Sequence, residues 1–237
     1  MKIHRFFLFD IELSCGKKEL KLANKELLHQ IAKVLKLKIG EQLALCDGKG
    51  KEAICVLEGV DKKELILKVV EYKESPTVGR KTILYLAVLK RENFELAVQK
   101  SAEIGVDKLV PMITDRTIKT GINLERLNKI SKEACELSGR VTLMEIEPMI
   151  KFKEATSKSK ENETNLFFTP GGVNFSPGKT FGNETKKVGL FIGPEGGWST
   201  EELILAKENK MKITGIGNLV LRGETAATIA SFLAVNY

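Results

Sequence analysis

Three glycines surround a Pro-Glu pair in the segment from Gly193 to Gly197, directly after an apolar run that ends at Ile192. Glycines let main-chain amides and carbonyls approach a ligand closely, because a Cβ would stand in the way. Ser199 follows the turn and forms a capping-box pattern with Glu202, which predicts the start of a helix. Ligands of α/β proteins bind at the carboxyl ends of parallel strands. The pattern therefore favours a ligand-binding loop over an ordinary strand-to-helix turn.

A second glycine-bearing turn lies in residues 213–227, where Gly215 and Gly217 end another apolar run. The segment is not a dinucleotide fingerprint, because Val220 stands where the third glycine belongs. Neither glycine-bearing turn is followed by Gly-Lys-Ser/Thr, so neither is a P-loop. The sequence thus argues against an enzyme that uses NAD or ATP. Glu224 could cap the helix that follows, and capping could operate together with function.

The composition of the 237 residues, 43% hydrophobic and 29% charged, is typical of a globular protein. Apolar runs such as 83–89 are far shorter than the roughly 20 residues that cross a bilayer. The basic, apolar start soon meets Asp10 and lacks a small-residue cleavage site, so we expect a cytoplasmic protein with no membrane segment. The net charge of +7 favours contact with a polyanion, although a lysine-rich solvated surface explains it equally well.

Metal and disulfide chemistry find little support in the sequence. The four cysteines form no C-x-x-C pair, and only two histidines are present, His4 and His29. Neither a zinc site nor a disulfide framework is expected, and buried free thiols are the better prediction. The cysteines are Cys15, Cys46, Cys55 and Cys135.

Residues 1–72 predict a small β-rich domain that resembles a barrel. Asp47-Gly48-Lys49-Gly50 is typical of a hairpin turn. Asn24 could cap a helix over 25–35 with an apolar face made by Leu27, Leu28, Ile31, Val34 and Leu35. Strands are expected at 6–13, 42–46, 51–59 and 64–70, and the polar residues 73–81 are interpreted as a linker.

From residue 82 to 237 strands alternate with helices, which predicts a parallel sheet with helices on both faces. Gly105 is expected to end the first helix in the left-handed conformation. The expected strands are 83–89, 107–113, 143–147, 164–169, 187–192 and 212–216; the expected helices are 92–104, 123–138, 151–159, 200–209 and one from 224.

The two turns together resemble a known family. Gly-Pro-Glu-Gly-Gly at 193–197 followed by Leu-Arg-x-Glu-Thr-Ala at 221–226 is similar to the RsmE family of ribosomal RNA small subunit methyltransferases, in the SPOUT superfamily. The likeness covers nearly the whole chain. It includes Arg5-Phe6-Phe7, His29 to Leu35 with Gly40 and Asp47-Gly48, Lys100 to Val106 with Pro111, Arg126, and Glu133 to Arg140.

The resemblance implies an N-terminal PUA-like β-barrel and a C-terminal α/β domain with a deep trefoil knot, a rare exception among protein folds. It also implies that the chain is a homodimer that binds S-adenosylmethionine (SAM) in the knot. The implied reaction methylates N3 of a uridine in 16S ribosomal RNA, with the assembled 30S subunit as the expected partner. The implied SAM-binding residues are Thr169, Pro170, Gly193, Pro194, Glu195, Gly196, Gly197, Ile216, Gly217, Leu221, Arg222, Thr225 and Ala226.

Uridine N3 carries a proton and must lose it around the time of methyl transfer. A cation beside the uracil carbonyls stabilises the developing negative charge, and Arg222 is the candidate. Glu224 is a candidate base or a group that orients Arg222, with helix capping as the alternative. The candidate RNA contacts are Arg5, Lys36, Arg91 and Lys100, each of which could instead be a solvated surface residue.

Three positions depart from the family pattern. Lys36 stands where arginine is common and loses the bidentate fork, Leu137 replaces a common glutamine, and Leu219 replaces a frequent basic residue. These changes bear on the RNA contacts rather than on the cofactor. Two other functions stay open: a methyltransferase of the same superfamily that acts on another ribosomal or transfer RNA position, and a non-catalytic RNA-binding protein of ribosome assembly.

Overall fold

The computed structural model of the chain describes residues 3–9, 13, 16–61, 63–75, 79–118, 120–182 and 185–237. The chain divides into two compact units. The first contains residues 1–77 together with 135–143, and the second contains 78–134 and 144–237. The helix α3 (Leu124–Ser138) therefore begins in the second unit and ends in the first.

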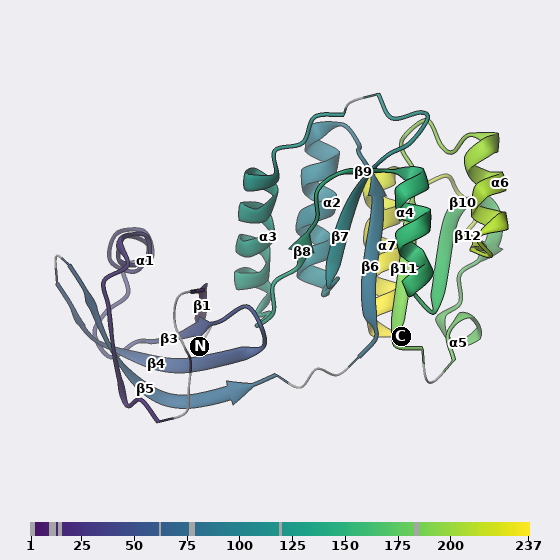
Figure 1. Ribbon diagram of the computed structural model, residues 1–237. Coiled ribbons are helices and arrows are strands. Elements are labelled where there is room, and N and C mark those ends of the chain that lie inside the picture. Colours follow the sequence, from purple (N-terminus) through teal and green to yellow (C-terminus); the bar gives the residue numbers. More distant parts are fainter. Residues whose placement is uncertain are drawn as a thin grey trace. The chain divides into compact units, whose positions relative to one another are not determined.

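The first unit is built on a five-stranded sheet (Figure 1). The parallel pair β1–β3 lies at one edge, and all other neighbours are antiparallel. The predicted hairpin is confirmed, because β3 and β4 pair across Asp47 to Gly50. The order is β1 (His4–Phe7), β3 (Gln42–Cys46), β4 (Lys51–Val60), β5 (Leu65–Glu74) and β2 (Glu19–Leu22).

Two predictions for this unit need correction. The strand β1 ends at Phe7, so the expected strand to residue 13 is wrong in its bounds; residues 10–12 lie outside the described residues. The predicted helix starts as expected, with the Asn24 side chain accepting a hydrogen bond from the Leu27 amide. It is α-helical only over α1 (Lys25–His29) and widens into a π-helix at Gln30–Val34, which leaves Val34 62% exposed.

The second unit is a seven-stranded sheet in which every strand pair is parallel, as the sequence predicts. The order is β12, β10, β11, β6, β7 and β8, with β9 also paired to β7. The strands are β6 (Lys81–Ala87), β7 (Lys108–Ile113), β8 (Glu145–Ile146), β9 (Ile150–Lys151), β10 (Thr164–Asn174), β11 (Lys187–Ile192) and β12 (Lys212–Gly215).

Helices cover both faces of this sheet (Figure 1). The helices α2 (Arg91–Ile104) and α7 (Gly223–Asn236) pack on each other, and α7 also packs on β6 and β11. Gly105 ends α2 with a φ of 112°, as predicted. The remaining helices are α4 (Phe152–Lys158), a 3-10 turn (Ser159–Glu161), α5 (Pro177–Thr180) and α6 (Thr200–Glu208). In the part of the chain that is described, no helix has the length and apolar character that a membrane crossing requires.

Aromatic packing fixes the centre of the sheet. Tyr85 and Phe191 are partners in the β6–β11 register, and their rings stack 4.4 Å apart at an angle of 8°. Phe152 from α4 meets the Phe191 ring edge-on at 6.2 Å. Because offset and edge-to-face arrangements are the favourable ones for aromatic pairs, this cluster holds the β6 and β11 ends in fixed positions.

After β12 the chain returns from the sheet edge to its middle. The first residue of α7, Gly223, lies against Leu89 at the end of β6, where an added Cβ would be 2.8 Å from the leucine Cδ2. The segment 216–222 therefore crosses past the ends of β10 and β11. The deep trefoil knot implied by the family resemblance stays a prediction.

A pH effect follows from the ion pairs that join α2 to α3. Both Nε and Nη2 of Arg126 donate to the Glu95 carboxylate, at 2.6 and 2.7 Å. Hydrogen bonds from Arg126 and then from Arg91 lower the pKa of Glu95 to about 2. Since its pKa is depressed on folding, Glu95 stabilises the fold above about pH 4.3, the unfolded value, and loses this effect as the pH falls towards 2.

We therefore expect Glu95→Gln to lower the free energy of unfolding at pH 7 and to have a much smaller effect near pH 2.5. Urea unfolding of both proteins at several pH values measures the difference. Glu201→Gln, which changes an exposed carboxylate on α6, is the control and should show little effect at either pH. The prediction would be contradicted if the difference in the free energy of unfolding between the wild type and Glu95→Gln did not change with pH.

Candidate functional site

A cavity of about 320 Å³ lies at the carboxyl ends of β10, β11 and β12. Three chain segments form it: residues 168–171 after the paired part of β10, residues 192–198 after β11, and residues 215–223 after β12, with Ala226 of α7. The carboxyl edge of a parallel sheet is where α/β proteins bind ligands. The two glycine-bearing turns that the sequence singled out thus meet around one cavity.

Most of the predicted cofactor-binding residues line this cavity. Gly196 and Thr225 do not. An added Cβ at Gly196 would face Arg116, 3.2 Å from its Cβ, and Thr225 is exposed on the first turn of α7. The residues of the prediction that line the cavity are Thr169, Pro170, Gly193, Pro194, Glu195, Gly197, Ile216, Gly217, Leu221, Arg222 and Ala226.

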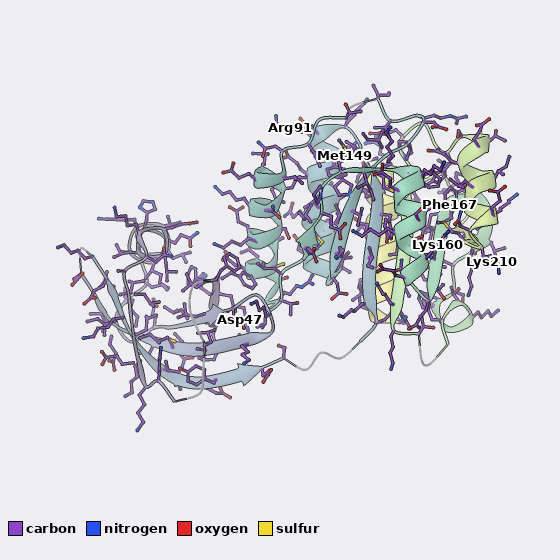
Figure 2. All side chains as sticks on the ribbon, viewed as in Figure 1. Asp47, Arg91, Met149, Lys160, Phe167 and Lys210 are labelled. Atoms are coloured by element: carbon purple, nitrogen blue, oxygen red, sulfur yellow. The ribbon has the colours of Figure 1, made fainter. Side chains whose placement is uncertain are left out.

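The turn at 193–197 wraps around the indole of Trp198. A Cβ at Gly193 would lie 2.9 Å from Cε2 of Trp198, so only glycine fits here. The indole Nε1 donates to the carbonyl of Phe168 at 2.8 Å, and its ring packs 4.3 Å from that of Phe167 (labelled in Figure 2). Gly197 has a φ of +69°, which favours glycine. Trp198 thereby joins the segments after β10 and β11, a role the sequence analysis did not assign to it.

Contacts from outside the cavity hold the same turn. The Arg116 guanidinium donates to the carbonyl of Gly196 at 2.9 Å. The carboxylate of Glu195 accepts from the main-chain amide of Lys90 at 3.0 Å, at the start of α2. Asp115 accepts a hydrogen bond from the Ser199 hydroxyl. These partners lie in loops after β6 and β7, so they were not apparent from the local pattern around the turn.

The capping box of α6 is confirmed. The Ser199 hydroxyl accepts from the Glu202 amide at 3.2 Å, and the Glu202 carboxylate accepts from the Ser199 amide at 2.9 Å. The second oxygen of Glu202 accepts from the amide of Asp115 at 3.0 Å. The cap therefore fixes the start of α6 and also anchors the loop after β7.

A second close main-chain approach lies between β10 and β12. The β10–β12 register shifts between Phe168 and Val173, so the intervening residues bulge out of the pairing and reach the cavity. A Cβ at Gly215 would lie 2.7 Å from the carbonyl oxygen of Gly172. Gly217, with a φ of +67°, then turns the chain. The need for glycine at 172 was missed, because its partner is distant in sequence.

Arg222 and Glu224 differ in their exposure. Arg222 lines the cavity, is exposed, and makes no ion pair with any described residue. Glu224 is only 8% exposed, and its Oε2 has no hydrogen-bond partner among the described residues. The start of α7 has no side-chain cap at Arg222. The first turn of α7 nevertheless buries both Gly223 and Glu224.

The four candidate RNA contacts are in different environments. Arg5 is mostly buried and paired with Glu52 at 3.3 Å, and Lys100 is paired with Glu103 on its own helix. Lys36 is exposed, with a φ of +53°. Arg91 also has a partner, Glu95, but its side chain is 71% exposed. Arg5 and Lys36 belong to the first unit, Arg91 and Lys100 to the second, and all four stay candidates.

Among the described residues, no group of three or more histidine, cysteine, aspartate or glutamate side chains could hold a metal ion. Cys46 and Cys55 are buried free thiols, as predicted, and Cys135 is buried as well, while Cys15 lies outside the described residues. Burial raises the pKa of both Cys46 and Cys55 to about 12, so neither thiol is reactive at neutral pH.

Two family models and several named relatives match this chain. The model of the RNA methyltransferase domain matches residues 76–234, and that of the RNA methyltransferase PUA domain matches residues 24–70. "Ribosomal RNA small subunit methyltransferase E" of Rickettsia conorii is 27% identical, over 97% of this chain and 94% of that protein. The protein of the same name from Helicobacter pylori (strain 26695) is 31% identical, over 74% and 76%.

Two solved structures share the fold of this protein over nearly the whole chain. The ribosomal RNA small subunit methyltransferase E of Neisseria gonorrhoeae, bound to S-adenosyl methionine, superimposes with a TM-score of 0.85 at 26% identity, over 97% of this chain and 95% of that one. A methyltransferase of Legionella pneumophila in complex with SAM gives 0.83 at 29% identity, over 98% and 96%. The first family model spans more than half of the chain and includes the whole cavity. The chain therefore belongs to the RNA methyltransferase domain family, with a PUA domain in its N-terminal part.

Proposed function

We propose that this protein transfers a methyl group from SAM to N3 of a uridine in the RNA of the small ribosomal subunit. The observation that carries the proposal is the cavity at the sheet edge, enclosed by three main-chain segments of the methyltransferase domain. The relatives named as small subunit methyltransferases support the RNA substrate, and the two SAM-bound structures support the cofactor.

The cavity suits SAM in both size and lining. Its volume falls within the range of about 300–1,000 Å³ that is usual for small-molecule sites. Apolar side chains such as Ile192 and Leu221 can cover a flat adenine ring, while main-chain groups at the glycines offer hydrogen bonds. Glu195, at the rim, contributes a negative charge near a positively charged donor. When bound, SAM supplies an activated methyl group.

Arg222 is the proposed catalytic cation. As N3 of the uracil loses its proton and forms the new N–CH₃ bond, negative charge spreads over the two flanking carbonyl oxygens. The Arg222 guanidinium is exposed at the cavity and has no carboxylate partner in the part of the chain that the structure describes, so it is available to stabilise this charge.

Glu224 is the proposed proton acceptor. Neither the helix-capping role nor an ion pair with Arg222 is supported by the described contacts. A buried carboxylate oxygen without a partner is costly, which argues that a substrate group or water completes it. Glu224 lies in the first turn of α7, two residues after Arg222, and is the group placed to accept the N3 proton.

We infer further that two copies of the chain act together in the cytoplasm on assembled 30S subunits. Support for a dimer comes from apolar side chains that are exposed on α7 and at the rim of the cavity. Arg91 and Lys36 are the preferred RNA contacts, since the side chains of Arg5 and Lys100 are less exposed. The exposed apolar residues are Leu219, Val220, Phe232 and Tyr237.

Deletion of the gene should remove one 3-methyluridine from 16S ribosomal RNA and leave transfer RNA unchanged. Mass spectrometry of nuclease digests from the deletion and parent strains measures this. Loss of a methyl group from another RNA position instead would show that the protein is a methyltransferase with a different target. Labelled SAM incubated with purified 30S subunits from the deletion strain should transfer its label, and no transfer would favour the non-catalytic alternative.

Arg222→Ala should reduce turnover by about 10²–10³-fold, because the charge that develops on the uracil is no longer stabilised. SAM affinity, measured by calorimetry, should stay within a few-fold, since the many other residues that line the cavity are unchanged. Lys207→Ala, on the exposed surface of α6, is the control and should retain full activity. Retained turnover in Arg222→Ala would remove this residue from the mechanism.

Gly193→Ala should weaken SAM binding by about tenfold or more, because the new methyl group would displace the Trp198 indole from beneath the cavity. Calorimetry with SAM provides the measurement, and the thermal unfolding midpoint reports on the fold. Gly182→Ala is the matched control, since its nearest neighbour lies 3.8 Å from an added Cβ. If both variants bind SAM equally well, this turn is not part of the cofactor site.

A further inference from the structure

A second cavity, of about 330 Å³, opens beside the first in the second unit. It lies between the end of β6, the first turn of α2, and the start of α3. Figure 2 labels Arg91, which stands where β6 ends and α2 begins. Its walls are mainly apolar, and the leucine, phenylalanine and isoleucine side chains that form them are Leu89, Phe94, Ile122 and Leu127. No role has been given to this cavity so far.

Only a thin wall separates the two cavities. Leu89 lines the second cavity and Gly223 lines the first, and a Cβ added to Gly223 would lie 2.8 Å from the leucine Cδ2. One residue further, the Lys90 amide is bonded to Glu195 of the first cavity. Arg222, the residue before Gly223 in the chain, lines the first cavity.

We propose that the second cavity receives the target uracil after it leaves the RNA stack, so that its reacting edge meets the methyl donor above the Leu89–Gly223 wall. This inference rests on the proposed function. Enzymes that modify a base must extrude it from its stack, and they hold the flipped base against apolar or aromatic side chains. An acceptor must also lie next to its donor, and this cavity shares a wall with the donor site.

The rim of the second cavity carries a charge that suits RNA. Arg91 and Arg126 both bind Glu95, so the three side chains together carry a net charge of +1. Arg126 uses two nitrogens for the carboxylate, whereas Arg91 uses only Nε. No hydrogen bond joins the Nη atoms of Arg91 to a described residue, so they are available to the phosphate of the extruded nucleotide. Glu95 holds the arginine in place at neutral pH.

A third cavity, at the opposite edge of the sheet, does not compete for this role. It lies at the amino ends of β6, β7 and β11. Lysines line it, but several of them are paired with glutamates, such as Lys108 with Glu145 and Lys187 with Glu161. Since it is remote from the glycine-bearing turns, a base bound there could not reach the donor.

The test is to place a larger side chain in the second cavity, at a position where the fold has room for it. Gly121 lines the cavity, and nothing lies within 4 Å of a Cβ added to it. Gly121→Phe should therefore fold normally and obstruct the uracil. Ile122→Trp is a second variant at the same wall, and Gly178→Phe is the matched control, since Gly178 also has open space and lines none of these cavities.

We expect Gly121→Phe and Ile122→Trp to lower turnover on 30S subunits from the deletion strain by about tenfold or more, with SAM affinity unchanged in calorimetry. Gly178→Phe should match the wild type in both measurements. Uridine 5′-monophosphate, titrated onto the protein saturated with S-adenosylhomocysteine and followed by saturation-transfer NMR, should bind the wild type and bind both cavity variants more weakly.

Full turnover in both variants, or unaltered nucleotide binding in both, would overturn the uracil assignment. The proposed function fails differently, through a wild-type protein that neither binds SAM nor transfers label. A wild type that binds SAM and methylates RNA while both variants remain fully active would therefore reject only this second cavity.

Discussion

Close contact between main chains, with no room for a Cβ, is the constraint on which the rest of this methyltransferase domain depends. At Gly172 and Gly215 two backbone segments approach so closely that a Cβ added to either glycine would lie less than 3 Å from the backbone of the other segment. Gly193 and Gly223 also leave no room for a Cβ, but their neighbours are side chains, the Trp198 ring and Leu89. These contacts draw the turns after β10, β11 and β12 together, and the cavity is the space that remains between them.

The rigidity of this arrangement comes from neighbouring loops. Arg116 holds a carbonyl of the 193–197 turn from outside, and Glu195 is tied to the first turn of α2. A turn fixed in this way has little freedom left to lose when a ligand binds, so more of the contact energy appears as affinity. The same tie places the start of α2, with Arg91, beside the donor cavity. Cofactor site and proposed base site thus share their supports.

The sequence predicted most of this domain, because its information is local. Continuous apolar runs predicted the parallel strands, Gly105 ended α2 as expected, and Ser199 with Glu202 formed the cap of α6. The features that the sequence could not predict depend on contacts with residues that are distant in the sequence. Asp115 and Arg116 look like ordinary loop residues until β7 is placed beside β6, one strand away from β11. Gly172 shows its purpose only against β12.

A ligand-binding loop that acts through its backbone affects how the sequences of family members can differ. Amides and carbonyls are the same in every amino acid, so side chains along 218–221 can change while the shape of the binding loop persists. Leu219 and Val220 are largely exposed, at 82% and 79%, so their side chains are available for other contacts such as the proposed dimer. The glycines at the close approaches are the positions that such a loop cannot replace without losing its shape. A chain only 26% identical to a cofactor-bound relative superimposes on it with a TM-score of 0.85, so the fold tolerates extensive change of its side chains.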